Sequence, residues 1–309
     1  MNGLYGWLMS FTAACMYGGS AIVIKMAYHA GLQPAALLAL QDIVSLFLMW
    51  PLVLFGRVWS PIRSLPWKNL LLLGIVGNLG VSVCYFWAAQ RMDISLLSMI
   101  IFSYPGFVLL YQIVMEKRRA KLREGLALLM ALTGLVLAVN PFRTLTAWPD
   151  LIGLLLAIGG ALTYAFMNVF GGKLTCELSV PLVTAISSTI STAGIVVLLP
   201  LNQWLPVGLT SEQVGLILLS GLLSTVLPMN LMYMGIRRIG VFRASVVSMI
   251  ELPCTLLLAY QILQERLLPL QWLGALLILV SIGLLQWRDA AEPGRGSVTS
   301  RVADVPDVH

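Results

Sequence analysis

Apolar runs of about 20 residues recur along nearly the whole chain, and a helix needs a run of about this length to cross the hydrocarbon core of a bilayer. Only 10% of the 309 residues are charged, whereas a soluble chain carries about 25% charged residues. We therefore predict an all-α integral membrane protein with ten transmembrane helices. The expected spans, numbered 1 to 10 in chain order, are residues 4–28, 34–55, 68–89, 95–115, 122–140, 150–172, 181–203, 212–235, 242–263 and 268–287.

The Lys and Arg residues are divided unequally between the two sides of this predicted bundle. If the N-terminus is cytoplasmic, all but four of the 19 Lys and Arg residues lie on the cytoplasmic side. The four on the outer side are Lys25, Arg91, Arg143 and Arg266. Because cytoplasmic loops of membrane proteins are enriched in Lys and Arg, we expect both termini in the cytoplasm. The net charge of +6 is thus a topology signal and does not indicate a nucleic-acid partner.

An internal repeat relates the two halves of the chain. Residues 111–135 and 260–284 are identical at eight of 25 positions at a constant offset of 149, and the matches include Tyr, Gln, Glu and Gly pairs. Each half then holds five spans, and because five is odd the second half enters the membrane from the opposite side. Such inverted repeats build secondary transporters, whose substrate sites lie near the midplane between the halves. We expect repeats over residues 1–141 and 142–288, followed by a disordered cytoplasmic tail over 289–309.

In both halves an acidic–basic pair ends one span and precedes a span that contains two glycines. These residues are Glu116, Lys117, Gly125 and Gly134 in the first half, and Glu265, Arg266, Gly274 and Gly283 in the second. With the ten spans and the repeat, this signature makes residues 3–288 resemble the EamA-type transporters of the drug/metabolite transporter (DMT) superfamily. One departure is that Met115 and Gln264 stand where that family often has a Gly before the acidic residue.

The resemblance implies a multi-pass carrier of the bacterial inner membrane with a cavity between its halves. Members of the family export amino acids, amino-acid-derived metabolites (opine-type metallophores among them) and toxic compounds. Others take up vitamins, and related families exchange nucleotide-sugars. The signature residues shape the ends of spans and do not line a pocket, so the resemblance does not identify the substrate.

Five spans carry polar side chains at helical spacing. Two explanations stand side by side, because Ser and Thr commonly pack between membrane helices and polar stripes also line cavities. Stripes in five spans favour a shared polar cavity, and spans 5 and 10, which lack them, are expected at the periphery. The stripes are Gln41, Asp42 and Ser45; Asn78, Ser82 and Tyr85; Tyr164 and Asn168; Thr184, Ser188 and Ser191; and Ser245, Ser248, Glu251 and Thr255.

Two carboxylates are predicted near the centre of the membrane. At a rise of 1.5 Å per residue, Glu251 lies about 13 Å from the start of span 9, and Asp42 about 12 Å from the start of span 2. A central acid costs about 2.5–3.5 kcal/mol on insertion scales, so its presence needs an explanation. Glu251 could bind a substrate ammonium group, exchange a proton during transport, or serve as a structural acid. The same alternatives apply to Asp42, and Lys25 could be a ligand or a snorkelling anchor.

Pro105 in span 4 and Pro253 in span 9 correspond in the repeat, and each removes a backbone hydrogen bond from its helix. Paired kinks suit a rocking motion of the halves, although a static kink is an equal alternative. Tyr104, beside Pro105, could contribute to an aromatic wall around a planar or cationic substrate. The candidates for substrate or proton binding are Glu251, Asp42, Ser248, Thr255, Asn78, Ser82, Tyr85, Tyr104, Tyr164, Asn168 and Lys25.

Other function classes find little support in the sequence. The chain has two histidines, and its four cysteines lie far apart, so we expect no catalytic site, metal site or cofactor. We predict a secondary transporter that exports small polar or zwitterionic metabolites by alternating access, with proton antiport or downhill flux as the energy source. The alternatives are uptake or exchange of a vitamin or nucleotide-like solute, and efflux of drugs or toxicants. The expected partners are the substrate, the lipid bilayer and, with antiport, protons, and the expected state is a monomer or a homodimer.

Overall fold

The computed structural model describes residues 2–56, 65–139, 150–199, 208–264 and 266–286. This part of the chain is helical without strands, and it contains ten helices long and apolar enough to cross a membrane, which confirms the predicted fold class. The predicted tail lies outside the described residues. The helices are α1 (Asn2–His29), α2 (Pro34–Phe55), α3 (Trp67–Leu72), η2 (Leu73–Leu79), α4 (Gly80–Ala89), α5 (Ile94–Ile101), α6 (Tyr104–Val114), α7 (Leu122–Val139), α9 (Leu151–Glu177), α10 (Val180–Leu198), α12 (Ser211–Gly221), η3 (Leu222–Val226), α13 (Leu227–Ile239), α14 (Val241–Val247), η4 (Ser248–Ile250), α15 (Glu251–Ile262) and α16 (Pro269–Gln286).

Local signals in the sequence explain where several helices begin. The Asp150 side chain accepts a hydrogen bond of 2.6 Å from the backbone N–H of Gly153 and so caps α9. Thr210 and Gln213 form a reciprocal capping box at the start of α12. Gly240 has a φ of +85°, which permits the sharp turn between α13 and α14. The loops therefore carry the residues that end one span and start the next.

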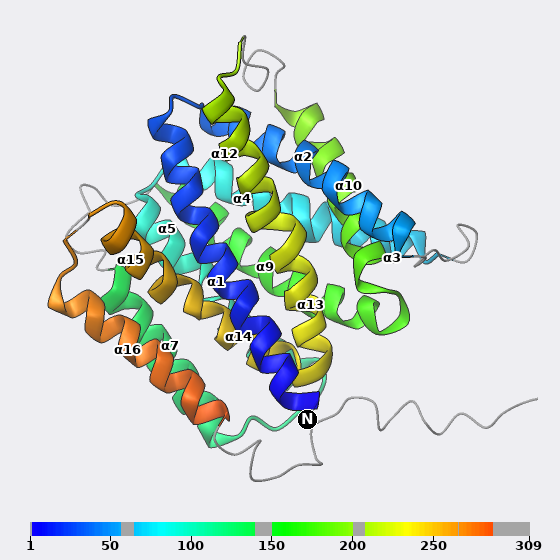
Figure 1. The fold of residues 1–309 in the computed structure, drawn as a ribbon. Coiled ribbons are helices and arrows are strands. Elements are labelled where there is room, and N and C mark those ends of the chain that lie inside the picture. The colour runs from blue at the N-terminus through cyan, green and yellow to red at the C-terminus, as the bar shows by residue number, and fades with distance from the viewer. Residues whose placement is uncertain (1, 57–64, 140–149, 200–207, 265, 287–309) are drawn as a thin grey trace, which may run out of the picture.

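The two halves interlock rather than lying as separate blocks (Figure 1). Span 1 (α1) packs along α13 of span 8, and its repeat counterpart, span 6 (α9), packs along α4 of span 3. In the same way α10 packs on span 3, and α2 packs on span 8. A Cβ at Gly74 would lie 3.1 Å from the Ser187 carbonyl oxygen, and a Cβ at Gly221 would lie 2.8 Å from the Gln41 carbonyl oxygen. Glycines in spans 3 and 8 thus let the backbones of opposite halves approach closely.

Helices α7 and α16 form a separate pair at one edge of the bundle (Figure 1). They cross where Gly134 faces Gly274, and a Cβ at Gly274 would lie 2.3 Å from the backbone nitrogen of Ala138. This peripheral position of spans 5 and 10 agrees with their lack of polar stripes.

Four spans depart from regular α-helix, and they do so in repeat-related pairs. Span 4 is interrupted just before Pro105, between α5 and α6, and span 9 tightens into the 3₁₀ turn η4 just before Pro253. Spans 3 and 8 contain the π-helical segments η2 and η3, which start at Leu73 and Leu222. The interruptions at the prolines follow from the missing backbone N–H. The π segments were not predicted, and such segments are frequent at functional sites.

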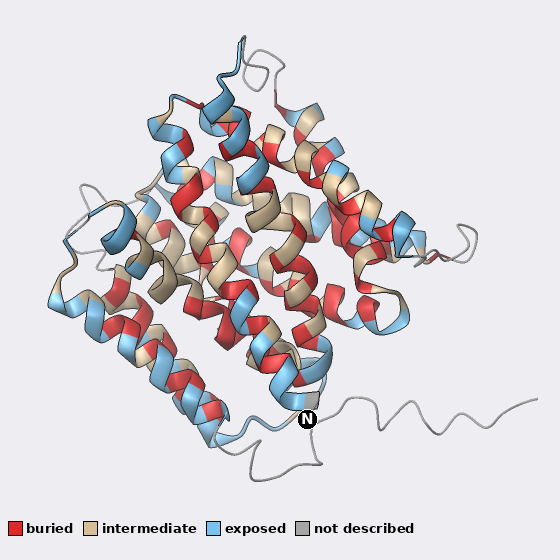
Figure 2. Ribbon diagram, in the orientation of Figure 1, coloured by how far each residue is buried: buried red, intermediate tan, exposed pale blue. Residues whose placement is uncertain are grey.

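The two parts of span 9 are packed very differently. We call the side of the bundle on which Asn2 lies the N side; α14 is at this side, because a Cβ at Gly6 of α1 would touch Ile239 at the end of α13. In α14 and η4 most side chains are buried, whereas α15 has one buried residue, Ala259 (Figure 2). Span 9 is therefore buried inside the bundle on the N side and more exposed towards the opposite side.

Candidate functional site

A cavity of about 220 Å³, lined mostly by residues with polar side chains, lies inside the bundle. Spans 1, 2, 3, 6, 7 and 8 contribute to it, so both halves form its walls. Both π segments take part, since η2 contains Asn78 and η3 contains Ser224 and Thr225. The lining residues are Tyr17, Asp42, Ser45, Asn78, Val81, Ser82, Tyr164, Met167, Ser188, Ser191, Thr192, Ser224, Thr225 and Met229.

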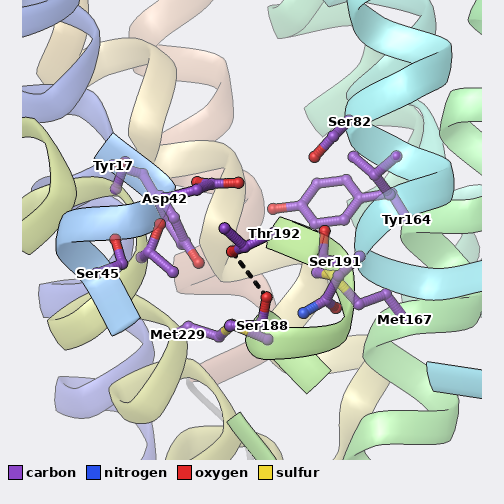
Figure 3. A pocket seen from close by; sticks show the side chains of 14 residues that line it. Tyr17, Asp42, Ser45, Ser82, Tyr164, Met167, Ser188, Ser191, Thr192 and Met229 are labelled. Carbon is purple, nitrogen blue, oxygen red and sulfur yellow. Dashed lines mark hydrogen bonds between the residues drawn. The ribbon is translucent and has the colours of Figure 1, made fainter. Parts of the chain in front are cut away.

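Asp42 is the one charged residue among these fourteen lining residues. Tyr17, Asp42 and Tyr164 point towards a common space from three different helices (Figure 3). Within the described part of the chain, the Asp42 carboxylate has neither a hydrogen-bond donor nor an ion-pair partner. The cavity therefore presents a negative group that the protein itself leaves uncompensated.

Several hydroxyl groups of the lining donate their protons to other groups of the protein. Ser45 donates to the carbonyl oxygens of Gln41 (2.7 Å) and Gly221 (3.1 Å). Thr192 donates to the Ser188 carbonyl oxygen at 2.9 Å (Figure 3), and Ser224 donates to the Ser220 carbonyl oxygen at 2.5 Å. Since a hydroxyl has one proton and two lone pairs, these three side chains can offer only acceptor positions to a ligand.

Asn78 lines the cavity beside these hydroxyl groups. Its side-chain nitrogen donates to the Ser187 hydroxyl at 3.3 Å. Its side-chain oxygen is buried and has no hydrogen-bond partner among the described residues, which is costly for a polar atom. Because this oxygen is buried, a solute in the cavity does not reach it in this conformation.

Four of the predicted site residues line this cavity. They are Asp42, Asn78, Ser82 and Tyr164, and they are joined by Ser45, Ser188 and Ser191 from the polar stripes. The structure does not bring the other candidates into the lining, namely Glu251, Ser248, Thr255, Tyr85, Tyr104, Asn168 and Lys25.

Several of these other candidates make contacts within or between helices. The Thr255 hydroxyl donates to the Glu251 carbonyl oxygen at 2.8 Å, and the Asn168 side chain donates to the Tyr164 carbonyl oxygen at 2.9 Å. Tyr85 is 40% exposed, and Lys25 is also exposed.

Glu251 lies at a contact between spans 4 and 9, which we call the kink junction (Tyr104, Ser245, Ser248 and Glu251). The Tyr104 hydroxyl is hydrogen-bonded to the Ser248 hydroxyl and donates to the Ser245 carbonyl oxygen at 3.4 Å. Tyr104 is fully buried, and Ser248 is 1% exposed. The junction thus joins the two proline-kinked spans at their interruptions.

The kink junction and the cavity share one wall. The rings of Tyr104 and Tyr164 lie 4.3 Å apart between centroids, and Tyr164 also lines the cavity. Glu251 lies near enough to these tyrosines and to Tyr17 to act on them electrostatically, but it does not line the cavity. Like that of Asp42, its carboxylate has neither a hydrogen-bond donor nor an ion-pair partner among the described residues.

Six polar or flexible residues of the lining were not predicted from the sequence: Tyr17, Met167, Thr192, Ser224, Thr225 and Met229. A signal existed for Tyr17, because it lies 147 residues before Tyr164, and Pro34 lies 147 residues before Pro181. The repeat, aligned at this offset, would have paired the two tyrosines. Ser224 and Thr225 lie in the π segment η3, which was not predicted.

Comparison with known proteins agrees with this architecture. The chain is 24% identical over 287 residues to an uncharacterized transporter, YcbK, of Bacillus subtilis (strain 168), covering 87% of this chain and 88% of the relative. It is 26% identical over 227 residues to an uncharacterized transporter of Archaeoglobus fulgidus, covering 72% of this chain and 78% of the relative. A crystal structure with 17% sequence identity has the same fold, with a TM-score of 0.80 over 93% of this chain and 98% of the other.

The model of the EamA-like transporter family matches the chain twice, at residues 4–140 and 151–287. Together with the ten apolar helices, these matches identify a transporter rather than an enzyme, located in the bacterial inner membrane as a multi-pass protein. The chain therefore belongs to the EamA-like transporter family.

Proposed function

We propose that this transporter exports a small polar or zwitterionic metabolite, such as an amino acid or an amino-acid-derived compound. The observation that carries the proposal is the cavity of about 220 Å³, which is walled by spans of both halves and contains Asp42. Pockets for drug-sized ligands usually have volumes of about 300–1,000 Å³. The smaller cavity favours a small metabolite over a drug or a nucleotide-sugar.

We propose alternating access between the two repeats, residues 1–141 and 142–288, as the mechanism. The kinks at Pro105 and Pro253 would let the ends of spans 4 and 9 move against the rest of the bundle. Most residues of α14 are buried on the N side, whereas α15, on the opposite side, has one buried residue. With the N side in the cytoplasm, as the distribution of Lys and Arg predicts, this conformation would release a solute outside the cell.

Untargeted comparison of metabolites in the medium and the cytosol of a deletion strain and its parent tests this proposal. An exporter predicts that one small polar compound accumulates in the cytosol of the deletion strain and is depleted in its medium. Counterflow of that compound into proteoliposomes containing the purified protein would then establish direct transport. The reverse pattern, with the compound depleted in the cytosol, would replace export by uptake.

Glu251 is proposed to exchange a proton during the transport cycle. Its place in the kink junction, beside Tyr104 and near the cavity wall, supports a coupling role rather than direct substrate binding. The test is Glu251→Gln in proteoliposomes with an imposed pH gradient. If this variant transports at the full rate and keeps the pH dependence of the wild type, the proton role fails.

A further inference from the structure

The cavity wall contains a negatively charged group and no positively charged one. Its lining contains a carboxylate and many hydroxyl groups, but it contains no Lys, Arg or His side chain. Three of the nine hydroxyl groups have their protons committed to backbone carbonyls, and others, such as those of Ser82 and Ser191, can donate as well as accept. The wall therefore carries a negative charge without a positive one, and its many oxygen atoms can accept hydrogen bonds.

A carboxylate buried without a partner is unfavourable, and a bound cation would relieve that cost. An ammonium group carries three N–H donors and a positive charge, so it matches both Asp42 and the surrounding acceptors. Tyr17 and Tyr164 also point towards this space (Figure 3), and the oxygen of a tyrosine hydroxyl can accept a hydrogen bond from an ammonium group.

A free carboxylate on the substrate has no cationic partner in the wall. Hydroxyl groups could donate to it, but it would lie close to the negative charge of Asp42, which repels it. In a cavity of about 220 Å³, a small zwitterion whose ammonium group contacts Asp42 must also hold its carboxylate close to that charge.

We propose that the cavity selects a small organic ammonium ion without a free carboxylate, with Asp42 as its counter-charge. This inference rests on the proposed function and narrows its substrate class, from amino-acid-derived metabolites in general to amines. The Thr192 hydroxyl oxygen accepts from the ammonium group or from other N–H and O–H groups of the same molecule, and Tyr17 and Tyr164 enclose it.

Three probes with the same phenyl ring test this inference: phenethylamine, phenylalanine and phenylacetate. They present a cation, a zwitterion and an anion to the same site, and binding to the purified full-length protein in detergent is measured by calorimetry. The expected result is binding of phenethylamine that is at least about tenfold tighter than binding of either other probe, since each hydrogen bond to a charged group contributes enough for such a factor. Equal or tighter binding of phenylalanine, or no binding of phenethylamine, would overturn the inference.

The variants are Asp42→Asn, Asp42→Glu, Glu251→Gln and the control Glu212→Gln, each checked for a monodisperse size-exclusion profile. We expect Asp42→Asn to weaken phenethylamine binding by about tenfold or more and Asp42→Glu to weaken it less. Glu212→Gln should leave the affinity unchanged, because Glu212 is an exposed acid of α12 outside the lining. Loss of affinity in Glu251→Gln with none in Asp42→Asn would place the counter-charge at the kink junction and refute the assignment. A carrier that exports a zwitterion and ignores amines would refute the inference while the proposed export function stands.

Discussion

The two intramembrane carboxylates of this transporter lie in contrasting surroundings. Neither carboxylate has a hydrogen-bond or ion-pair partner among the described residues. Asp42 lines the cavity, whereas Glu251 lies outside the lining, next to the Tyr104–Ser248 hydrogen bond that ties two spans together. The sequence predicts both acids at a similar depth. The contrast teaches that depth in the membrane identifies a residue that needs an explanation, and that the packing of neighbouring helices decides whether that residue lines a cavity.

The largest loss of stability is expected from a substitution where span 1 meets the kink junction. A Cβ at Gly18 would lie 2.8 Å from the Glu251 carbonyl oxygen and 2.9 Å from the Cys254 Cβ, so a side chain cannot enter without moving the backbone. We expect Gly18→Leu to lower the free energy of unfolding by about 1–3 kcal/mol or more, or to prevent folding. Gly19→Leu is the matched control, because a Cβ at Gly19 would touch only Leu258 at 4.0 Å. Equal thermal unfolding of the two variants in detergent would show that span 1 does not pack tightly on the junction.

Chemical labelling tests whether the cavity and the junction differ in access to water. In a variant whose four cysteines are replaced by alanine, Ser82→Cys lies in the cavity wall, and Ser248→Cys lies in the buried junction. A small cationic methanethiosulfonate reagent should modify the thiol at Ser82 readily and leave the thiol at Ser248 protected. The measurement is the mass of the labelled protein over time. Modification of both thiols at the same rate would remove the distinction between the two regions.

A smaller loss of stability is expected when a hydroxyl group is removed from Tyr104 or Tyr164, whose rings pack together. Tyr104→Phe removes the hydroxyl that bonds to Ser248 and to the Ser245 carbonyl oxygen, and it should lower the free energy of unfolding by about 0.5–1.5 kcal/mol. Tyr164→Phe removes a hydroxyl that faces the cavity, and it should leave the melting temperature close to that of the wild type. If Tyr164→Phe proves the more destabilising of the two, the Tyr104 hydroxyl is not a main stabilising contact of the kink junction.

The sequence predicted much of the fold because a membrane restricts the possibilities. Each span must satisfy its own backbone hydrogen bonds, so run length alone identifies the ten helices. The repeat, with its odd number of spans in each half, then determined the inverted architecture. The packing of α7 and α16 at the edge also followed, since neither helix has a polar stripe.

The candidate site was only partly predictable. The stripes led to Asp42, Ser45, Asn78, Ser82, Tyr164, Ser188 and Ser191, all of which line the cavity. The same pattern also marked Asn168 and Thr255, which donate to backbone carbonyls of their own helices. A polar side chain at helical spacing is equally able to face a cavity or to bond a carbonyl one turn back, so spacing cannot separate these cases.

By itself the sequence determined the membrane location, the ten spans, the repeat and the two kinked prolines, because these depend on hydrophobicity, periodicity and backbone chemistry along one chain. Only the tertiary structure decided that Asp42 lines the cavity and that Glu251 lies outside its lining. That choice depends on how spans of opposite halves approach one another at Gly74, Gly221 and Gly18. Contacts between residues far apart in the chain set these positions, and no local pattern encodes them.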